Sequence, residues 1–256
     1  MELFDSHAHY DDKRFAEDYD EVILNAFNSG VKYILNAGSD IATSKKSIML
    51  AEKYDFVYAA VGVHPHEAEK LSEDGFNEIK KMGSHQKVVA IGEIGLDYYY
   101  DHSPRDVQRY WFEKQINLGK ELNLPLIIHN RDSHEDMMDI IRKNAPYSNS
   151  GVLHCFTGSW EMAKQLLDLG LYLSFGGPIT FKNAKKAIDI IGKMPIDRIL
   201  IETDCPYLTP EPFRGKRNHS GYVNLVAEKI SEIRGISMQE AANLTTMNTK
   251  RLFGIE

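Results

Sequence analysis

Histidines occur at short spacing beside an apolar segment near the start of this sequence. The chain reads FDSHAH there, so that His7 and His9 are two residues apart. Side chains at positions i and i+2 of a β-strand point to the same face, and both imidazoles would therefore face one way. Solvated or hydrogen-bonded histidines are the ordinary alternative. We interpret the pair as metal ligands, because similar side chains follow later apolar segments.

Those later segments end in histidines or carboxylates. The residues are His64 in GVHPH, Glu93 in GEIGLD, His129 in IIHNR, His154 in LHCFTG and Asp204 in ETDCP. Imidazoles and carboxylates without thiolates suit divalent Mg, Mn, Zn or Co. One tetrahedral catalytic ion could not use all of the candidate ligands, so we predict two divalent ions with Glu93 between them. The predicted ligand set is His7, His9, Glu93, His129, His154 and Asp204. Two divalent ions bound by only two carboxylates keep an excess of positive charge, which suits an anionic substrate.

Other histidines fall in predicted loops or helices, where we expect them to be solvated. They are His66, His85, His102, His134 and His219.

The candidate ligands must be positioned by a fold that collects strand ends. The apolar segments are nearly continuous, which is typical of parallel strands buried on both faces. Helical patterns separate them, for example over 106–122, and two more helices are expected over 222–234 and 238–253. The predicted strands are 2–4, 31–38, 57–63, 88–95, 125–129, 151–156, 171–176 and 198–203.

This alternation predicts an α/β fold, a (β/α)8 TIM barrel, whose active site lies at the C-terminal ends of the strands. A doubly wound open sheet is the alternative, but no glycine-rich phosphate loop follows the first predicted strand. No linker or low-complexity segment interrupts the sequence. We therefore expect one domain over residues 1–256.

The composition limits the class of protein. The chain has 256 residues, 43% of them hydrophobic, and a net charge of -7, which disfavours coating of nucleic acid or membranes through bulk charge. Cys155 and Cys205 are the two cysteines, so a disulfide framework is excluded. Neither a secretory signal nor a membrane span is visible, and we expect a cytoplasmic protein without a membrane partner. The sequence does not indicate an oligomeric state.

Several motifs together resemble one family. DSHAH, GVHPH, GEIGLDYY, IIHNR, HCFTGS, ETDCPYLTP and RGKRN are similar to motifs of the TatD family of metal-dependent deoxyribonucleases, in family order from residue 3 to beyond residue 250. The resemblance implies an amidohydrolase-like barrel with divalent metals at the six ligands named above. It places Glu93 where other barrel hydrolases have a carbamylated lysine, and His64 against the scissile phosphate. It also implies Mg²⁺-dependent 3′-5′ exonuclease activity on single-stranded DNA.

The sequence departs from the family pattern at two places. Cys205 stands where the family commonly has serine, and His219 and Ser220 replace a Glu-Pro pair after RGKRN. Neither departure changes a proposed ligand, but the second bears on a loop that would help to select the substrate.

We therefore expect phosphodiester hydrolysis by a metal-activated water. Asp204 is the predicted general base and Glu93 the second catalytic carboxylate. His64, Arg131 and Arg214 are the predicted substrate contacts, with a salt bridge or a solvated turn as the alternative for the arginines. Lys216 is a further candidate for phosphate contact, and the aromatic candidates for base stacking are Tyr98, Tyr99, Tyr100, Tyr207 and Phe213.

Two other functions remain open at this point. The same metals could serve a hydrolase of small phosphoesters, lactones or amides, whose activity would depend less on salt than polymer binding does. A non-enzymatic module stabilised by metal is disfavoured, because a structural metal normally needs fewer, fully enclosed ligands.

Overall fold

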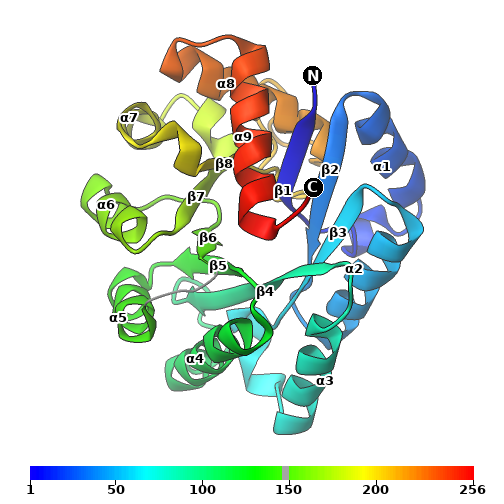
Figure 1. Cartoon of the computed structure of the whole chain (residues 1–256), viewed down its shortest axis with the longest axis vertical. Coiled ribbons are helices and arrows are strands. Elements are labelled where there is room, and N and C mark those ends of the chain that lie inside the picture. Colours follow the sequence, from blue (N-terminus) through cyan, green and yellow to red (C-terminus); the bar gives the residue numbers. More distant parts are fainter. Residues whose placement is uncertain (146–149) are drawn as a thin grey trace. The chain divides into compact units, whose positions relative to one another are not determined.

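The structure is a computed structural model that describes residues 1–145 and 150–256. Over these residues, eight strands alternate with helices along the chain, which confirms the predicted (β/α)8 fold class (Figure 1). The strands are β1 Leu3–Ala8, β2 Val31–Ala37, β3 Val57–Val61, β4 Val88–Asp97, β5 Leu126–Arg131, β6 Gly151–Leu153, β7 Tyr172–Phe175 and β8 Ile199–Ile201. The α-helices are α1 Tyr19–Asn28, α2 Ile41–Lys53, α3 Glu73–Gly83, α4 Arg105–Leu122, α5 His134–Asn144, α6 Trp160–Asp168, α7 Lys185–Lys193, α8 Val223–Arg234 and α9 Met238–Phe253.

The described residues form two compact units. The first comprises Met1–Asn36, Cys155–Leu167 and Tyr172–Glu256, and the second comprises Ala37–His154 and Asp168–Leu171. Each unit holds half of the strands, and each is described by itself below. The organisation of residues 1–256 as a single domain stays a prediction.

The first unit is built on β1, β2, β7 and β8. β1 is parallel to β2 and β7 to β8, and an isolated bridge joins Ala8 at the end of β1 to Cys205 after β8. Helices α8 and α9 pack against β1 and β8, and Figure 1 shows α9 beside β1. Helix α9 has the predicted bounds because the Ser237 side chain caps its first turn and Gly254 ends it in a left-handed conformation.

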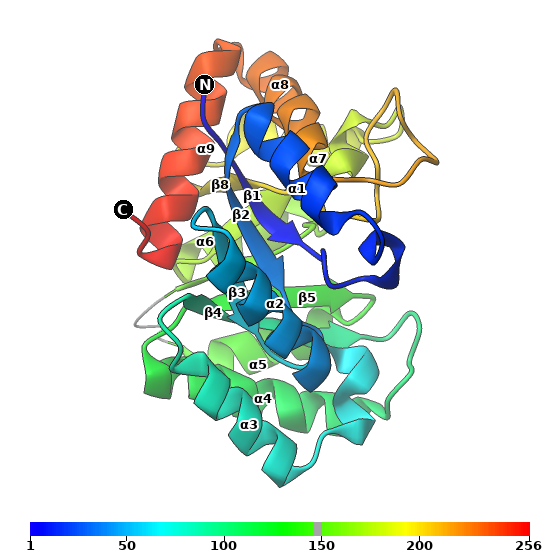
Figure 2. The same cartoon turned by 90° about the vertical axis from the view of Figure 1, so that its right-hand side faces the viewer.

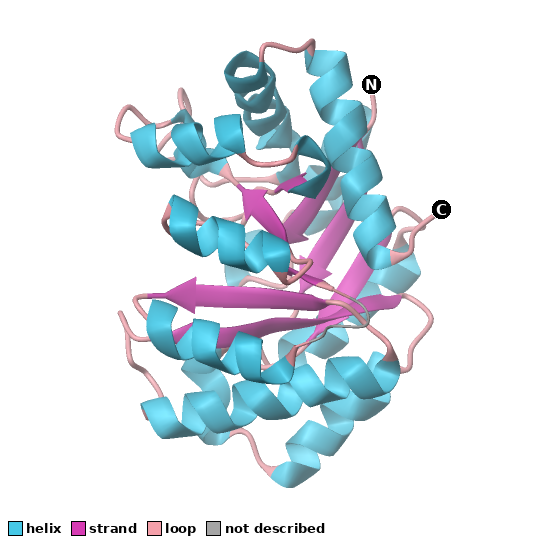
Figure 3. Ribbon diagram, turned by 60° about the vertical axis from the view of Figure 1, so that its left-hand side comes forward, coloured by secondary structure: helices cyan, strands magenta, loops and turns pink. Residues whose placement is uncertain are grey.

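The second unit contains β3, β4, β5 and β6 as parallel neighbours. Helix α2 packs on β3 and lies beside it in Figure 2. Strand β4 pairs with β5, is buried along its whole length and extends two residues beyond the predicted 88–95. Figure 3 distinguishes the strands, in magenta, from the helices, in cyan. The extension occurs because Asp97 pairs in register with Arg131 and its backbone N–H donates to the Gln108 side chain at 2.9 Å.

Three predicted strands are at least two residues too long at their C-terminal ends. Instead of 57–63, 151–156 and 198–203, the observed strands end at Val61 in β3, Leu153 in β6 and Ile201 in β8. After β6 and β8 the backbone soon leaves the extended conformation, because Cys155 and Asp204 both have left-handed φ angles, of 45° and 54°. Both turns lie at predicted metal ligands: Asp204 is one itself, and Cys155 directly follows His154.

Among the described helices, none combines the length and the apolar composition needed to cross a bilayer. Even α4, with 18 residues, carries arginine, lysine and glutamate along its length. The cytoplasmic location stays a prediction.

We expect the close approach of β4 and β5 to make Gly95 irreplaceable. Gly95 has φ 141°, and a Cβ atom there would lie 2.0 Å from the His129 carbonyl oxygen. Gly95→Ala should lower the free energy of unfolding by about 3 kcal/mol or more, because the strands must separate and the backbone is strained. Urea denaturation measures this loss.

Gly170→Ala is the matched control, since Gly170 also has a positive φ, of 84°, but has no atom within 4 Å of the added Cβ. It should cost about 1 kcal/mol, through backbone strain alone. Equal losses in the two variants would contradict the steric explanation.

Candidate metal centre

Three predicted ligands come together in the first unit. The Nε2 atoms of His7 and His9 lie 3.0 Å apart, as expected for residues on one face of a strand end. Asp204 Oδ1 lies 3.4 Å from His9 Nε2 and 3.8 Å from His7 Nε2. All three residues therefore offer ligand atoms within 4.8 Å of one another. Both histidines are buried, whereas the Asp204 side chain is 16% exposed and reaches solvent.

Backbone hydrogen bonds position this cluster. The Asp204 N–H donates to the His7 carbonyl at 2.9 Å, and the His9 N–H donates to the Cys205 carbonyl at 2.8 Å. The left-handed backbone of Asp204 turns the loop after β8 at this point. The end of β1 and the loop after β8 are thus joined in a single register, which sets where the three ligand side chains point.

Buried polar residues support the same loop. The Asp5 carboxylate accepts the Thr203 N–H at 2.8 Å and the Thr203 hydroxyl at 2.6 Å. Burial raises the Asp5 pKa to about 7, although the hydrogen bonds from Ser220 and Thr203 act in the opposite direction. Asn218, from the RGKRN motif, donates to the Thr203 carbonyl at 2.8 Å and to the Tyr207 carbonyl at 2.6 Å. Sequence reasoning missed the roles of Asp5 and Asn218.

The second unit holds another cluster, centred on one oxygen of Glu93. Glu93 Oε1 lies 2.9 Å from His129 Nδ1, 2.9 Å from His154 Nε2 and 3.5 Å from His64 Nε2. Burial disfavours the charged carboxylate, but the surrounding imidazoles hold the Glu93 pKa well below its usual range. The His64 pKa is also lowered, well below the usual value for histidine, but here burial itself is the cause and the neutral form is favoured.

Asp97 and His66 belong to this cluster, although neither was predicted to. Asp97 Oδ2 lies 2.8 Å from His66 Nε2 and 3.3 Å from His129 Nε2. The expectation that His66 is simply solvated is therefore wrong. Asp97 was not predicted as a site residue because the predicted strand, 88–95, ended before it. The available signal was its place in the motif GEIGLD, four residues after Glu93.

The predicted substrate contacts lie beside aromatic rings. The Arg131 guanidinium stacks over Tyr99 at 3.9 Å and over Tyr100 at 4.7 Å, while Arg214 lies 4.4 Å over the Phe181 ring. Tyr99 and Tyr100 are 57% and 50% exposed, so they remain available to a ligand.

The other aromatic and basic candidates near the loop after β8 pack on their own unit. Phe213 stacks on Tyr222 at 4.7 Å, and Lys216 lies 5.5 Å over the Phe213 ring. The Tyr207 hydroxyl donates to Asp12 at 3.1 Å.

The two departures from the family pattern have distinct surroundings. The Cys205 side chain is fully buried, and its backbone carbonyl accepts the His9 N–H at 2.8 Å. His219 packs on Tyr222 with 4.0 Å between ring centroids, and the Ser220 N–H donates to the Tyr10 hydroxyl at 3.0 Å. Both departures are thus accommodated by packing around the loop after β8.

The donor sets of both clusters fit divalent metal ions. Each combines imidazole nitrogens with a carboxylate, and within the described part of the chain no cysteine thiolate joins either group. Such ligands bind borderline-to-hard divalent cations. Because imidazoles lie against the carboxylates at 2.9–3.8 Å, a cation would take over the charge balance that protonated histidines otherwise supply.

Comparisons with known proteins bear on the family. Residues 4–254 match the family model described as TatD related DNase. The chain belongs to the TatD family. It is 49% identical to the uncharacterized metal-dependent hydrolase YabD of Bacillus subtilis, and the match covers 99% of both chains. The present chain is therefore a metal-dependent hydrolase of this family.

Two further relatives extend this result. The chain is 32% identical to the 3′-5′ ssDNA/RNA exonuclease TatD of Citrobacter rodentium, covering 99% of this chain and 98% of the relative. The crystal structure of the TatD homolog YjjV from Escherichia coli superposes with a TM-score of 0.93 at 31% identity, covering 99% of this chain and 98% of the other. The likeness in sequence and in fold thus spans nearly the whole chain.

We predict that Asp97 controls the protonation of His129 in the metal-free protein. Burial lowers the His129 pKa, but the hydrogen bonds that its imidazole donates to Asp97 and Glu93 outweigh burial and raise the pKa above its usual value. Asp97→Asn should therefore lower the His129 pKa, as measured by NMR titration of the imidazole. Asp101→Asn should not, because Asp101 is exposed and pairs with Arg105.

The same shift has a signed effect on stability. A raised histidine pKa stabilises the fold below the unfolded pKa of about 6.5, and this contribution is lost as pH rises through the folded pKa. The stability difference between wild type and Asp97→Asn should therefore be larger at about pH 5.5 than at about pH 9 in urea denaturation. A difference that grows with pH would contradict this assignment.

Proposed function

We propose that this TatD-family hydrolase cleaves phosphodiester bonds and removes nucleotides from the 3′ end of single-stranded DNA. The observation that carries the proposal is the convergence of imidazoles and carboxylates in two largely buried clusters, His7–His9–Asp204 and His64–Glu93–His129. The exonuclease activity in the name of the Citrobacter rodentium relative supports a nucleic-acid substrate.

We assign two divalent ions, Mg, Mn, Zn or Co, to the predicted ligands. His7, His9 and Asp204 would hold one ion, and Glu93, His129 and His154 would hold the other. When bound, such ions stabilise negative charge on the phosphate and lower the pKa of water. Glu93 suits the second ion because the His129 Nδ1 and His154 Nε2 atoms each lie 2.9 Å from one of its oxygens.

The chain's own residues would orient the substrate and move protons. Asp204 is the proposed general base, because its carboxylate is partly exposed and its backbone is fixed by the hydrogen bond from its N–H to the His7 carbonyl. His64 is the proposed phosphate contact. Since burial keeps its imidazole neutral, His64 would donate a hydrogen bond to the phosphate and would not add a positive charge.

An exposed aromatic platform, formed by Tyr99, Tyr100, His102 and Arg131, supports binding of a single strand. Tyr100 and His102 stack at 5.5 Å with their planes 8° apart, and Arg131 covers both tyrosine rings. Unpaired bases stack on exposed aromatic rings with little dependence on sequence, and arginine adds attraction for the phosphates. Arg131 thus acts from a stacked position, and Arg214 is its counterpart over Phe181 in the first unit.

The decisive experiment uses metal-reconstituted protein and single-stranded DNA labelled at either end. A 3′-5′ exonuclease releases the 3′ label first, and EDTA should abolish release while circular dichroism stays unchanged. A parallel panel of small phosphoesters, lactones and amides tests the alternative substrate class. Cleavage of that panel without cleavage of DNA, or activity that is insensitive to salt, would overturn the nuclease proposal.

Asp204→Asn should separate metal binding from proton transfer. The substitution keeps an oxygen ligand but removes the basic site, so single-turnover cleavage should fall by about 10²-fold or more while metal content is largely retained. Metal analysis accompanies each rate measurement.

Glu202→Gln is the matched comparison, because Glu202 is fully buried and accepts the Cys155 N–H at 2.7 Å, a bond that glutamine can also accept. Its effect should be milder. Cleavage by Asp204→Asn at the wild-type rate with full metal would exclude Asp204 as the base.

Tyr100→Ala should weaken binding of single-stranded DNA. Loss of one stacking surface is worth about 1–3 kcal/mol, so KM should rise by about fivefold or more while kcat changes little. Tyr110→Ala is the control, because Tyr110 is similarly exposed, at 49%, but its hydroxyl donates to Glu73 on the flank of α4. Equal increases in KM for both variants would count against the platform.

A further inference from the structure

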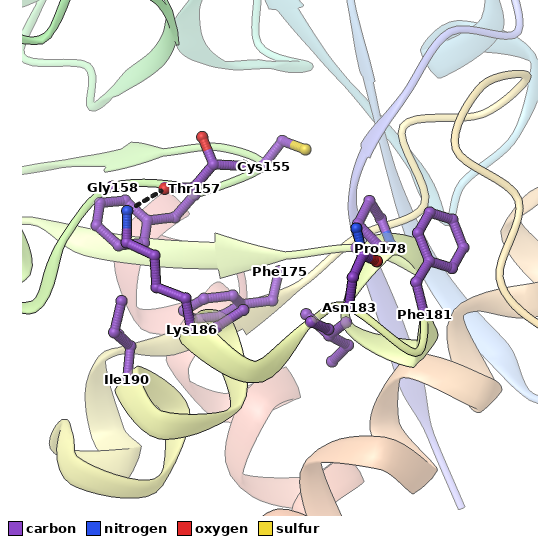
Figure 4. A pocket seen from close by; sticks show the side chains of 14 residues that line it. Cys155, Thr157, Gly158, Phe175, Pro178, Phe181, Asn183, Lys186 and Ile190 are labelled. Carbon is purple, nitrogen blue, oxygen red and sulfur yellow. Dashed lines mark hydrogen bonds between the residues drawn. The ribbon is translucent and has the colours of Figure 1, made fainter.

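A pocket of about 220 Å³ lies in the first unit, between the segment after β6, the segment after β7 and helix α7 (Figure 4). Three phenylalanines, Phe156, Phe175 and Phe181, contribute aromatic walls, while Asn183 and Lys186 add polar groups. Ligand pockets combine apolar walls with a few polar groups in this way, and drug-sized ligands usually need about 300 Å³ or more. The pocket is therefore of a size for a single small ring system.

We propose that this pocket binds the base of the nucleotide that is being cleaved, an inference that rests on the proposed nuclease function. Aromatic and apolar walls accept the faces of a nucleobase, and amide or amine groups hydrogen-bond to its edges. Asn183 can both donate and accept such bonds. Lys186 Nζ donates to the Thr157 carbonyl at 3.2 Å, which holds its amine at the pocket (Figure 4).

The pocket adjoins the segment that carries the proposed general base. Gly176 lines the pocket, and a Cβ atom there would lie 3.4 Å from Glu202 Cγ. The Glu202 side chain also accepts the N–H of Cys155, another lining residue, at 2.7 Å. Since Glu202 is two residues before Asp204, both walls of the pocket are tied to the loop that presents Asp204. A nucleotide whose phosphate lies at Asp204 has its base only one sugar away.

Positive charge at the pocket favours a nucleotide over a neutral ring compound. Lys186 lines the pocket, and Arg214 lies 4.4 Å over the ring of Phe181, which also lines it. Both cations are exposed. Because the chain as a whole carries a net charge of -7, attraction for a phosphate must come from such local groups.

Filling the pocket tests the proposal. Ala187 is a half-buried lining residue on α7, so Ala187→Phe places a ring where the base would bind. Lys185→Phe is the matched control, because Lys185 is exposed on the same helix and does not line the pocket. The substrates are two single-stranded DNA oligonucleotides that differ only in whether the 3′-terminal nucleotide carries its base or is abasic.

We expect wild type and Lys185→Phe to prefer the base-bearing oligonucleotide by about tenfold in kcat/KM, in keeping with the worth of one stacked base. Ala187→Phe should bring this ratio close to one. A ratio that is unchanged in Ala187→Phe, or the lack of any preference in wild type, would overturn the proposal.

A second measurement does not depend on cleavage. Cys155 lines the pocket, whereas Cys205 is fully buried and burial raises its pKa, so iodoacetamide should modify Cys155 first. In EDTA, dAMP should cause a saturable loss of Cys155 alkylation in wild type, and 2-deoxyribose 5-phosphate should cause none. The protection should disappear in Ala187→Phe, as followed by peptide mass spectrometry.

The two measurements distinguish the two proposals. Protection by dAMP in a protein that cleaves no DNA would leave the base pocket standing and overturn the nuclease function. Cleavage of DNA without protection, and without preference for the base-bearing end, would overturn the pocket alone.

Discussion

The pairing of the end of β1 with the loop after β8 is the constraint on which the first ligand cluster depends. Two backbone hydrogen bonds, from Asp204 to His7 and from His9 to Cys205, join segments at opposite ends of the sequence. A slip by one residue would turn the side chains to the other face and separate the ligands. Hydrogen bonds from Thr203 to Asp5 and from the Asn218 amide to the Thr203 carbonyl fix the same loop, so the ligand geometry depends on buried polar groups.

Charge balance governs the second cluster. Glu93 and Asp97 are buried carboxylates, and buried charges need partners. Imidazoles supply these partners, and His129 lies between the two carboxylates, with Nδ1 2.9 Å from Glu93 and Nε2 3.3 Å from Asp97. A metal ion requires neutral imidazoles, so protons and metal compete for this cluster. In the metal-free protein, a proton on His129 would balance part of the charge of the two carboxylates.

The surfaces that would select a substrate differ in chemistry from the ligand clusters. The aromatic platform offers exposed tyrosine rings on which Arg131 stacks. The pocket of the first unit offers enclosed rings near Lys186 and Arg214. An acidic chain can bind a polyanion only through local arrangements of this kind. A platform tolerates any base, whereas an enclosed pocket distinguishes a base from its absence, so the two would contribute affinity and selection separately.

The sequence by itself determined the alternation of strands and helices, the bounds of α9 and the candidate metal ligands. These follow from local signals, namely continuous apolar segments, a Ser cap with a terminal glycine, and polar residues placed where buried strands end. The tertiary structure alone decided the extension of β4 to Asp97, the contacts of His66, and the early ends of β6 and β8. It also decided that Arg131 lies on tyrosine rings and that Asp5 binds Thr203. Each of these depends on a partner that is distant in sequence or on a left-handed turn in a non-glycine residue, and local patterns specify neither.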